Sequence, residues 1–133
     1  MFSLHYVKNF IQTAIMAYKF INSEYLDSVS GGDTDVIREI VIMFKEQCIE
    51  IFNEMTSLFA EKNYVSLGFL AHKAKSSVAI MGMNDLAIML KNFELQAKGE
   101  KEPELYESYI KRFKEETDAA VKELEDMVNL RLP

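Results

Sequence analysis

The sequence predicts an all-α protein: an antiparallel four-helix bundle with an additional N-terminal helix and a short lead-in segment. Three observations predict this fold. Apolar side chains recur at the three- and four-residue spacing of helices, and no stretch shows the sustained alternation of a β-strand. Glycines, capping residues and a proline divide the chain into long segments. Helices that each have one apolar face and are joined by short turns pack as an antiparallel bundle.

The chain is expected to form one main domain. Its 133 residues are 49% hydrophobic and 27% charged, which suits a globular domain that needs no disulfide or metal. We expect residues 1–20 to form a helical extension that caps the end of the bundle, and residues 21–133 to form the bundle domain. The alternative for the extension is a linker that belongs to a larger protein.

The first elements precede the bundle and lead into it. Residues 2–19 are predicted to form the additional helix, and NSEYLDSVS, residues 22–30, a short turn-rich or helical segment. A pair of glycines then breaks the chain, and Asp33 caps a long amphipathic helix over about residues 33–61. The predicted core stripe of this helix is Val36, Ile40, Met43, Phe44, Ile51, Met55, Leu58 and Phe59.

Three further helices follow, each with a recognisable start or end. Asn63 caps the second helix, which Gly82 ends in a left-handed turn. Asn84 caps the third, which ends at Gly99, and Pro103 suits the first turn of the fourth. The core stripe of the third helix is Leu86, Leu90, Phe93 and Ala97, and that of the fourth is Leu105, Tyr109, Phe113, Ala120, Leu124 and Val128.

Charge and composition exclude several classes of partner. The net charge is −6, whereas nucleic acid and anionic membranes attract clustered Lys and Arg. The apolar stretch at residues 10–21 is too short and too polar to span a bilayer, and no targeting signal is recognisable. The single cysteine, Cys48, cannot form an internal disulfide, and no Cys/His spacing suits a metal. We expect Cys48 to be a packing residue, the location to be cytoplasmic and the partner to be a protein.

His72 is the residue with a candidate chemical role. On a helix over residues 63–81 it lies about 140° from the core stripe, so it points outward or along a groove. Exposed helix faces usually carry long polar side chains, but several small or apolar residues surround this histidine. They leave room for another protein's surface, and the predicted docking residues are Val65, Gly68, Phe69, Lys73, Ser76 and Ala79. His5 has no such setting and receives no role.

Glu94 and Lys75 are the expected partners of His72. His72 lies ten residues before the glycine that ends its helix, and Glu94 lies ten residues after Asn84. Antiparallel helices therefore place the two side chains at one height. A carboxylate there accepts a hydrogen bond from Nδ1–H and leaves Nε2 free as a nucleophile, while Lys75 and Lys73 supply charge for a phosphoryl group. By geometry alone, an ordinary surface histidine with ordinary surface charges is the alternative.

The stretch AHKAKSSVAIMG, residues 71–82, resembles the signature of the histidine-containing phosphotransfer (HPt) domain family. In that family an Ala-His pair is followed by a lysine three residues on, by small residues, and by a glycine ten residues past the histidine. Here these are His72, Lys75, Ser76, Ser77 and Gly82. Residues 21–47 are similar to the family's lead-in, so the resemblance covers about residues 18–130. Ser76 stands where the family usually has glycine, and Ala74 where a larger apolar residue is common.

The resemblance implies the function of a phosphoryl carrier in a two-component phosphorelay. HPt domains accept a phosphoryl group from the aspartate of a response-regulator receiver domain and pass it to another receiver. The expected partners are thus receiver domains, a hybrid sensor histidine kinase, or both. In related domains a glutamate or glutamine at the position of Glu94 bonds the imidazole. The chain has no P-loop or nucleotide lid, so we expect no ATP site, no enzyme activity and no cofactor of its own, with Mg²⁺ supplied by the receiver.

Other interpretations of the chain stay open. One is a non-catalytic helical module that binds a receiver or a kinase and carries no phosphate. Another is a fragment of a multidomain sensor kinase rather than a free-standing, monomeric protein. A haem or di-iron bundle is set aside because the sequence has two histidines and no Glu-x-x-His pair.

Overall fold

The computed structural model describes residues 18–131. Every regular element in this range is helical, which confirms the all-α prediction. The α-helices are α2 (Ser23–Ser30), α3 (Thr34–Ala60), α4 (Tyr64–Ile80), α5 (Asn84–Lys98) and α6 (Tyr106–Arg131), and a short 3-10 helix, η1 (Pro103–Leu105), precedes α6. The predicted helix over residues 2–19 lies almost wholly outside the described residues, as does His5. Residues 18–20, the described end of the predicted extension, are not helical.

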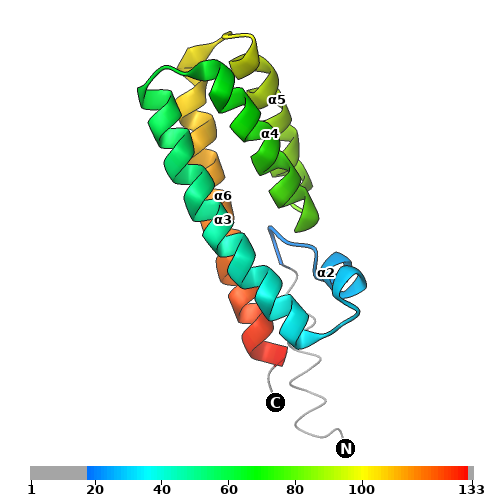
Figure 1. Ribbon diagram of the computed structural model, residues 1–133. Coiled ribbons are helices and arrows are strands. Elements are labelled where there is room, and N and C mark those ends of the chain that lie inside the picture. Colours follow the sequence, from blue (N-terminus) through cyan, green and yellow to red (C-terminus); the bar gives the residue numbers. More distant parts are fainter. Residues whose placement is uncertain (1–17, 132–133) are drawn as a thin grey trace, which may run out of the picture.

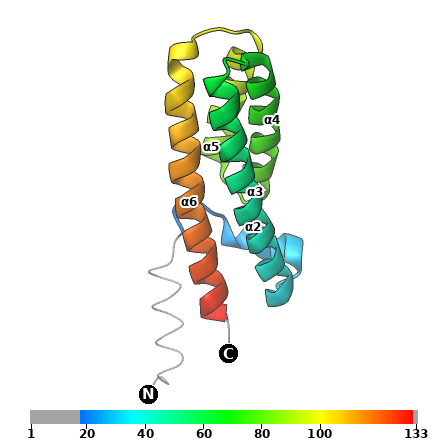
Figure 2. The same ribbon diagram turned by 60° about the vertical axis from the view of Figure 1, so that its left-hand side comes forward.

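The four long helices, α3 to α6, lie side by side, and each runs antiparallel to the one before it (Figure 1, Figure 2). Their connections are short, with residues 61–63, 81–83 and 99–102 separating successive helices or η1. α3 and α6, of 27 and 26 residues, extend beyond the α4–α5 pair at one end of the molecule. α4 packs more extensively against α5 than against any other helix. α4 and α5 are therefore the most extensively packed pair of helices among residues 18–131.

One hydrophobic core runs through all of these helices. Its largest fully buried side chains include Tyr106, Phe93, Phe113, Ile51, Met55, Leu67, Leu90 and Leu124. They come from α3, α4, α5 and α6 together, so no helix buries its apolar face alone. Within residues 18–131, no helix has both the length and the apolar character needed to cross a membrane.

The core face of α3 differs from the predicted one over the first half of the helix. Val36 and Met43 are 39% and 68% exposed, and Ile40 is only half-buried. The buried residues are instead Ile37, Val41, Phe44, Cys48, Ile51 and Met55. This set continues Ile51 and Met55, which were predicted correctly, backwards at helical spacing. Leu58 and Phe59, which were also predicted in the stripe, are half-buried. α3 carries apolar residues on adjoining faces, so spacing alone did not decide which face is buried.

The predicted helix ends are mostly correct. The side chains of Asp33 and Asn63 accept backbone N–H groups at the starts of α3 and α4, as N-caps do. Gly82 has φ 77° and forms the predicted left-handed turn after α4. Asn84 is wrong as a cap, because it is the first residue of α5. Met83 takes the cap position, and no side chain completes that cap.

The fourth predicted helix also begins differently. Pro103 opens η1, a single 3-10 turn, rather than the first turn of an α-helix. Leu105, predicted in the core stripe, is 37% exposed, whereas Tyr106 is fully buried. A 3-10 helix turns about 120° per residue instead of about 100°, so it displaces Leu105 from the stripe that α6 follows.

Residues 19–22 are hydrogen-bonded to α6 and to the turn between α4 and α5. The Glu123 carboxylate on α6 accepts the backbone N–H groups of Lys19 at 2.7 Å and Phe20 at 2.9 Å. The backbone N–H of Asn22 donates to the carbonyl of Met81, in the α4–α5 turn, at 3.2 Å. α2 follows and lies at the end of the α4–α5 pair, beside the part of α3 that extends past it (Figure 1). These hydrogen bonds tie residues 19–22 to α6 and to the turn between α4 and α5.

Candidate functional site

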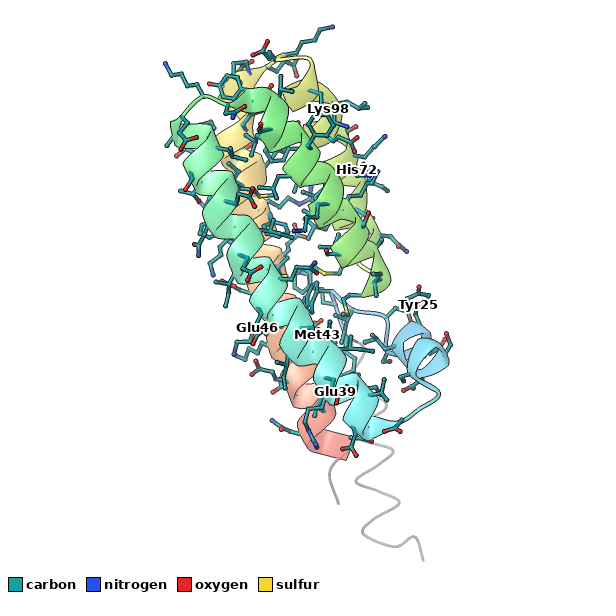
Figure 3. All side chains as sticks on the ribbon, in the orientation of Figure 1. Tyr25, Glu39, Met43, Glu46, His72 and Lys98 are labelled. Carbon is teal, nitrogen blue, oxygen red and sulfur yellow. The ribbon has the colours of Figure 1, made fainter. Side chains whose placement is uncertain are left out.

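His72 and Glu94 meet across the α4–α5 seam. His72 Nδ1 lies 2.9 Å from Glu94 Oε1, the hydrogen bond that the helix register predicts. The His72 side chain is 54% exposed, whereas that of Glu94 is 5% exposed. Figure 3 shows His72 at the edge of the molecule that α4 and α5 share, with Lys98 above it on the same edge. An accessible imidazole is thus held from behind by a buried carboxylate.

Three lysines surround the Glu94 carboxylate. Lys98 Nζ lies 3.0 Å from Oε2, Lys75 Nζ 3.5 Å from Oε1, and Lys91 Nζ 4.0 Å from Oε2. Burial by itself raises the pKa of Glu94, but hydrogen bonds from Lys98 and His72 and the nearby positive charges lower this pKa to about 2. Glu94 is therefore ionised at neutral pH although it is buried. The cluster combines one carboxylate with three ammonium groups, so it is electropositive within a protein of net charge −6.

The ionised carboxylate decides which nitrogen of His72 carries the proton. A carboxylate ion only accepts hydrogen bonds, so at 2.9 Å the imidazole Nδ1 must donate. Lys75 Nζ lies 3.5 Å from the same Nδ1. It cannot donate to a protonated nitrogen, so its partner is the carboxylate. The neutral ring then presents Nε2, with its lone pair, on the side away from Glu94.

Lys98 was not predicted as part of the site. Its ammonium group donates to Glu94 and lies 4.4 Å from the centre of the Phe69 ring. Lys98 stands four residues after Glu94 on the same helix, a spacing at which oppositely charged side chains meet. That spacing was a signal in the sequence. The link to Phe69 on α4 was not, because it depends on how the two helices pack.

Gly68 needs a correction. It was predicted on the open docking surface, but it is buried against α5. A side-chain carbon at this position would lie 2.7 Å from Lys98 Cγ and 2.8 Å from the backbone nitrogen of Lys98. The missing side chain therefore lets α4 and α5 approach closely and gives the Lys98 side chain its path. It does not clear space for a partner.

The other predicted docking residues lie at the surface. Val65 and Phe69 are 42% and 61% exposed, and Lys73, Ser76 and Ala79 are exposed as well. Helical spacing puts most of them on the outward side of α4 around His72. Ser76 Oγ donates to the carbonyl of His72 at 3.4 Å, so its hydroxyl is turned toward its own helix. Ile80, which was not predicted, extends this face with a side chain that is 52% exposed. We call Val65, Phe69, Lys73, Ser76, Ala79 and Ile80 the α4 docking face.

The remaining chemistry-bearing residues do not add a second centre. Among residues 18–131, no group of three or more His, Cys, Asp or Glu side chains could hold a metal ion. Cys48 is buried, and burial raises the pKa of its thiol to about 12. An uncharged buried thiol packs as a small apolar group and is a poor nucleophile, in line with the packing role predicted for it.

The chain matches no protein-family model, no curated protein and no solved structure. The HPt resemblance therefore stays a prediction from residues 71–82.

Proposed function

We propose that this protein is a histidine phosphotransfer protein of a two-component phosphorelay and that its four long helices form an HPt bundle. His72 accepts a phosphoryl group from the aspartate of a receiver domain and passes it to another receiver. One observation carries this proposal: the exposed imidazole donates Nδ1–H to a buried, ionised glutamate at 2.9 Å. A carrier needs this arrangement, because it fixes the nucleophilic nitrogen without closing the site to a partner.

The transfer step balances without a proton leaving the ring. The lone pair of His72 Nε2 attacks the phosphorus of the aspartyl phosphate. An N–P bond forms while the P–O bond to the aspartate breaks, and the carboxylate leaves with the bonding electrons. The ring keeps its Nδ1 proton and gains one positive charge, which the Glu94 carboxylate stabilises through the hydrogen bond it already accepts. The second transfer is the same step in reverse, with a different receiver aspartate as nucleophile.

The lysines have a separate task in this proposal. A phosphoryl group on Nε2 brings negative charge to the surface of an acidic protein, and the electropositive cluster offsets it. Lys75 is 24% exposed and follows His72 by one helical turn, so its ammonium group can turn from Glu94 toward the phosphoryl oxygens. Lys73 is exposed beside it. The receiver brings Mg²⁺, which neutralises the phosphoryl group while it is bound to the aspartate.

The α4 docking face suits a protein partner. It places exposed apolar side chains, among them Phe69 and Ile80, along one helix on both sides of His72. The small residues Ser76, one helical turn from His72, and Ala79, two turns away, leave a partner's active centre room to approach. In this proposal the protein acts as a monomer toward cytoplasmic receiver domains. Its single cysteine is buried and free, which suits a reducing compartment.

The test is phosphotransfer from a panel of purified receiver domains labelled with acetyl phosphate. Label is expected to move to the natural protein and not to His72→Gln, because glutamine keeps a polar side chain but has no nucleophilic ring nitrogen. His5→Gln is the matched control and is expected to accept label normally. Equal labelling of His72→Gln would refute the assignment of the nucleophile. Binding of receivers without any transfer would favour the non-catalytic binding module instead.

A further inference from the structure

We propose that Lys98 is a positioning residue that couples the α4 docking face to the imidazole. Its side chain, which passes Gly68 and lies against the Phe69 ring, fixes the carboxylate of Glu94 that orients His72. The functional meaning of this coupling rests on the phosphotransfer role proposed above. The coupling itself is a property of the free protein and is measured there.

The Lys98 side chain passes directly over Gly68. Gly68 leaves open the space through which this side chain crosses the α4–α5 seam, since an added carbon there would lie 2.7 Å from Lys98 Cγ. The ammonium group arrives 3.0 Å from Glu94 Oε2. A long, flexible side chain is thus confined by a neighbouring backbone, which lowers the entropy that it loses when it forms the ion pair.

The two oxygens of the Glu94 carboxylate have different partners. Lys98 bonds Oε2, and His72 bonds Oε1. Because the two oxygens belong to one planar group, fixing Oε2 also fixes the direction in which Oε1 faces the imidazole. Lys91, at 4.0 Å from Oε2 and 49% exposed, is too far for a hydrogen bond and is more solvated. Lys75 approaches Oε1 at 3.5 Å, a longer and weaker contact than the 3.0 Å contact of Lys98 with Oε2.

Lys98 also contacts the α4 docking face, through Phe69. The Lys98 ammonium lies 4.4 Å from the centre of the Phe69 ring, within the range of a cation–π interaction. Phe69 is 61% exposed and belongs to the α4 docking face. A partner that covers Phe69 excludes water from this contact, and both the cation–π interaction and the ion pair strengthen when they are desolvated. Docking would thereby restrict the motion of the Glu94 carboxylate, and so hold the imidazole more firmly while Nε2 is aligned with the phosphoryl group.

The experiment measures the tautomer of His72 in the free protein by ¹⁵N NMR of the imidazole nitrogens, under conditions in which the ring is neutral. In the natural protein, Nδ1–H is expected to dominate. Lys98→Met is expected to lower the ratio of the Nδ1–H to the Nε2–H tautomer by at least about threefold, the scale of one lost hydrogen bond. Lys98→Arg is expected to restore it. Phe69→Leu, which keeps an apolar side chain but removes the ring, is expected to lower the ratio in the same direction.

Two matched controls distinguish positioning of the carboxylate by Lys98 from a general loss of positive charge and from a general loss of apolar surface on the α4 docking face. Lys91→Met removes one positive charge from the same carboxylate, and Val65→Ala removes apolar surface from the same helix face; neither is expected to change the ratio. An unchanged ratio in Lys98→Met, or an equal change in Lys91→Met, would overturn the positioning role. An unchanged ratio in Phe69→Leu would overturn the coupling to the docking face. If the ratios change as expected but no receiver transfers phosphate, the carrier function fails while the positioning role stands.

Discussion

At the scale of single residues, the site depends on one buried carboxylate. The side chain of Glu94 is 5% exposed, yet it keeps its charge because His72 and three lysines compensate the loss of water. The hydrogen bond to Glu94 fixes the tautomer of the imidazole, and the same carboxylate is the common partner of the three lysines. Removing the carboxylate should therefore affect both stability and the state of the histidine.

Glu94→Gln makes the stability effect measurable. The pKa of Glu94 in the folded protein is about 2, below its ordinary value of 4.5. The ionised form therefore contributes stability that is fully present above about pH 4.5 and is lost as pH falls toward 2. We expect Glu94→Gln to cost about 2 kcal/mol of unfolding free energy at pH 6, and this difference should narrow at pH 3.

Urea unfolding at both pH values checks this expectation. Glu39→Gln, on the exposed surface of α3, is the control and is expected to differ little from the natural protein at either pH. A difference for Glu94→Gln that is the same at pH 6 and pH 3 would contradict the lowered pKa.

At the scale of the helices, the site depends on the close approach of α4 and α5. Gly68 allows this close approach. A glycine is required there because a side chain would meet atoms of α5, not because α4 itself needs a glycine. The sequence predicted the helices, the caps of α3 and α4 and the register of His72 against Glu94, because each follows from local spacing and short turns. It did not predict Lys98, whose contact with Phe69 requires two helices to be placed together.

Gly68→Ala tests this close approach by the sign of its effect. Helix propensity alone predicts that alanine stabilises the interior of α4 by up to about 1 kcal/mol. The added carbon would instead lie 2.8 Å from the backbone nitrogen of Lys98, so α4 and α5 must separate. We expect a net loss of about 1–3 kcal/mol in unfolding free energy.

Gly99→Ala is the matched control for that variant. Gly99 has φ −87°, and a carbon there would meet no atom closer than 3.4 Å. Thermal unfolding of both variants is therefore expected to show a lower midpoint for Gly68→Ala and little change for Gly99→Ala. Stabilisation by Gly68→Ala would mean that the seam is looser than described.

The wrong prediction for the buried face of α3 also has its cause in how helices pack against each other. Phe44, Ile51 and Met55 were assigned correctly to the core, but the first half of the helix offered apolar residues on adjoining faces. Val36 and Met43 lie on the face that the other helices leave uncovered. Which of two apolar faces is buried is set by the partners of a helix, so spacing within α3 could not decide it.

At the scale of the whole molecule, the lysines around Glu94 form a local excess of positive charge in an acidic protein. The protein has a net charge of −6, yet Lys75, Lys91 and Lys98 gather around one carboxylate beside His72. Residues 19–22 link α6 to the α4–α5 turn, because Lys19 and Phe20 donate to Glu123 and Asn22 donates to Met81. Composition predicted the net acidity. Lys91 and Lys98 lie on α5 with Glu94, and the packing of α4 against α5 adds Lys75 and the imidazole of His72 to them.

The most direct measurement locates the phosphoryl group on the protein after transfer from a labelled receiver domain. Mass spectrometry of peptides prepared at alkaline pH, where phosphohistidine survives, reports its position. We predict a single phosphoryl group on the peptide that contains His72 and none on the peptide that contains His5. A phosphoryl group on another residue, or none after exposure to receivers that bind the protein, would contradict the carrier function.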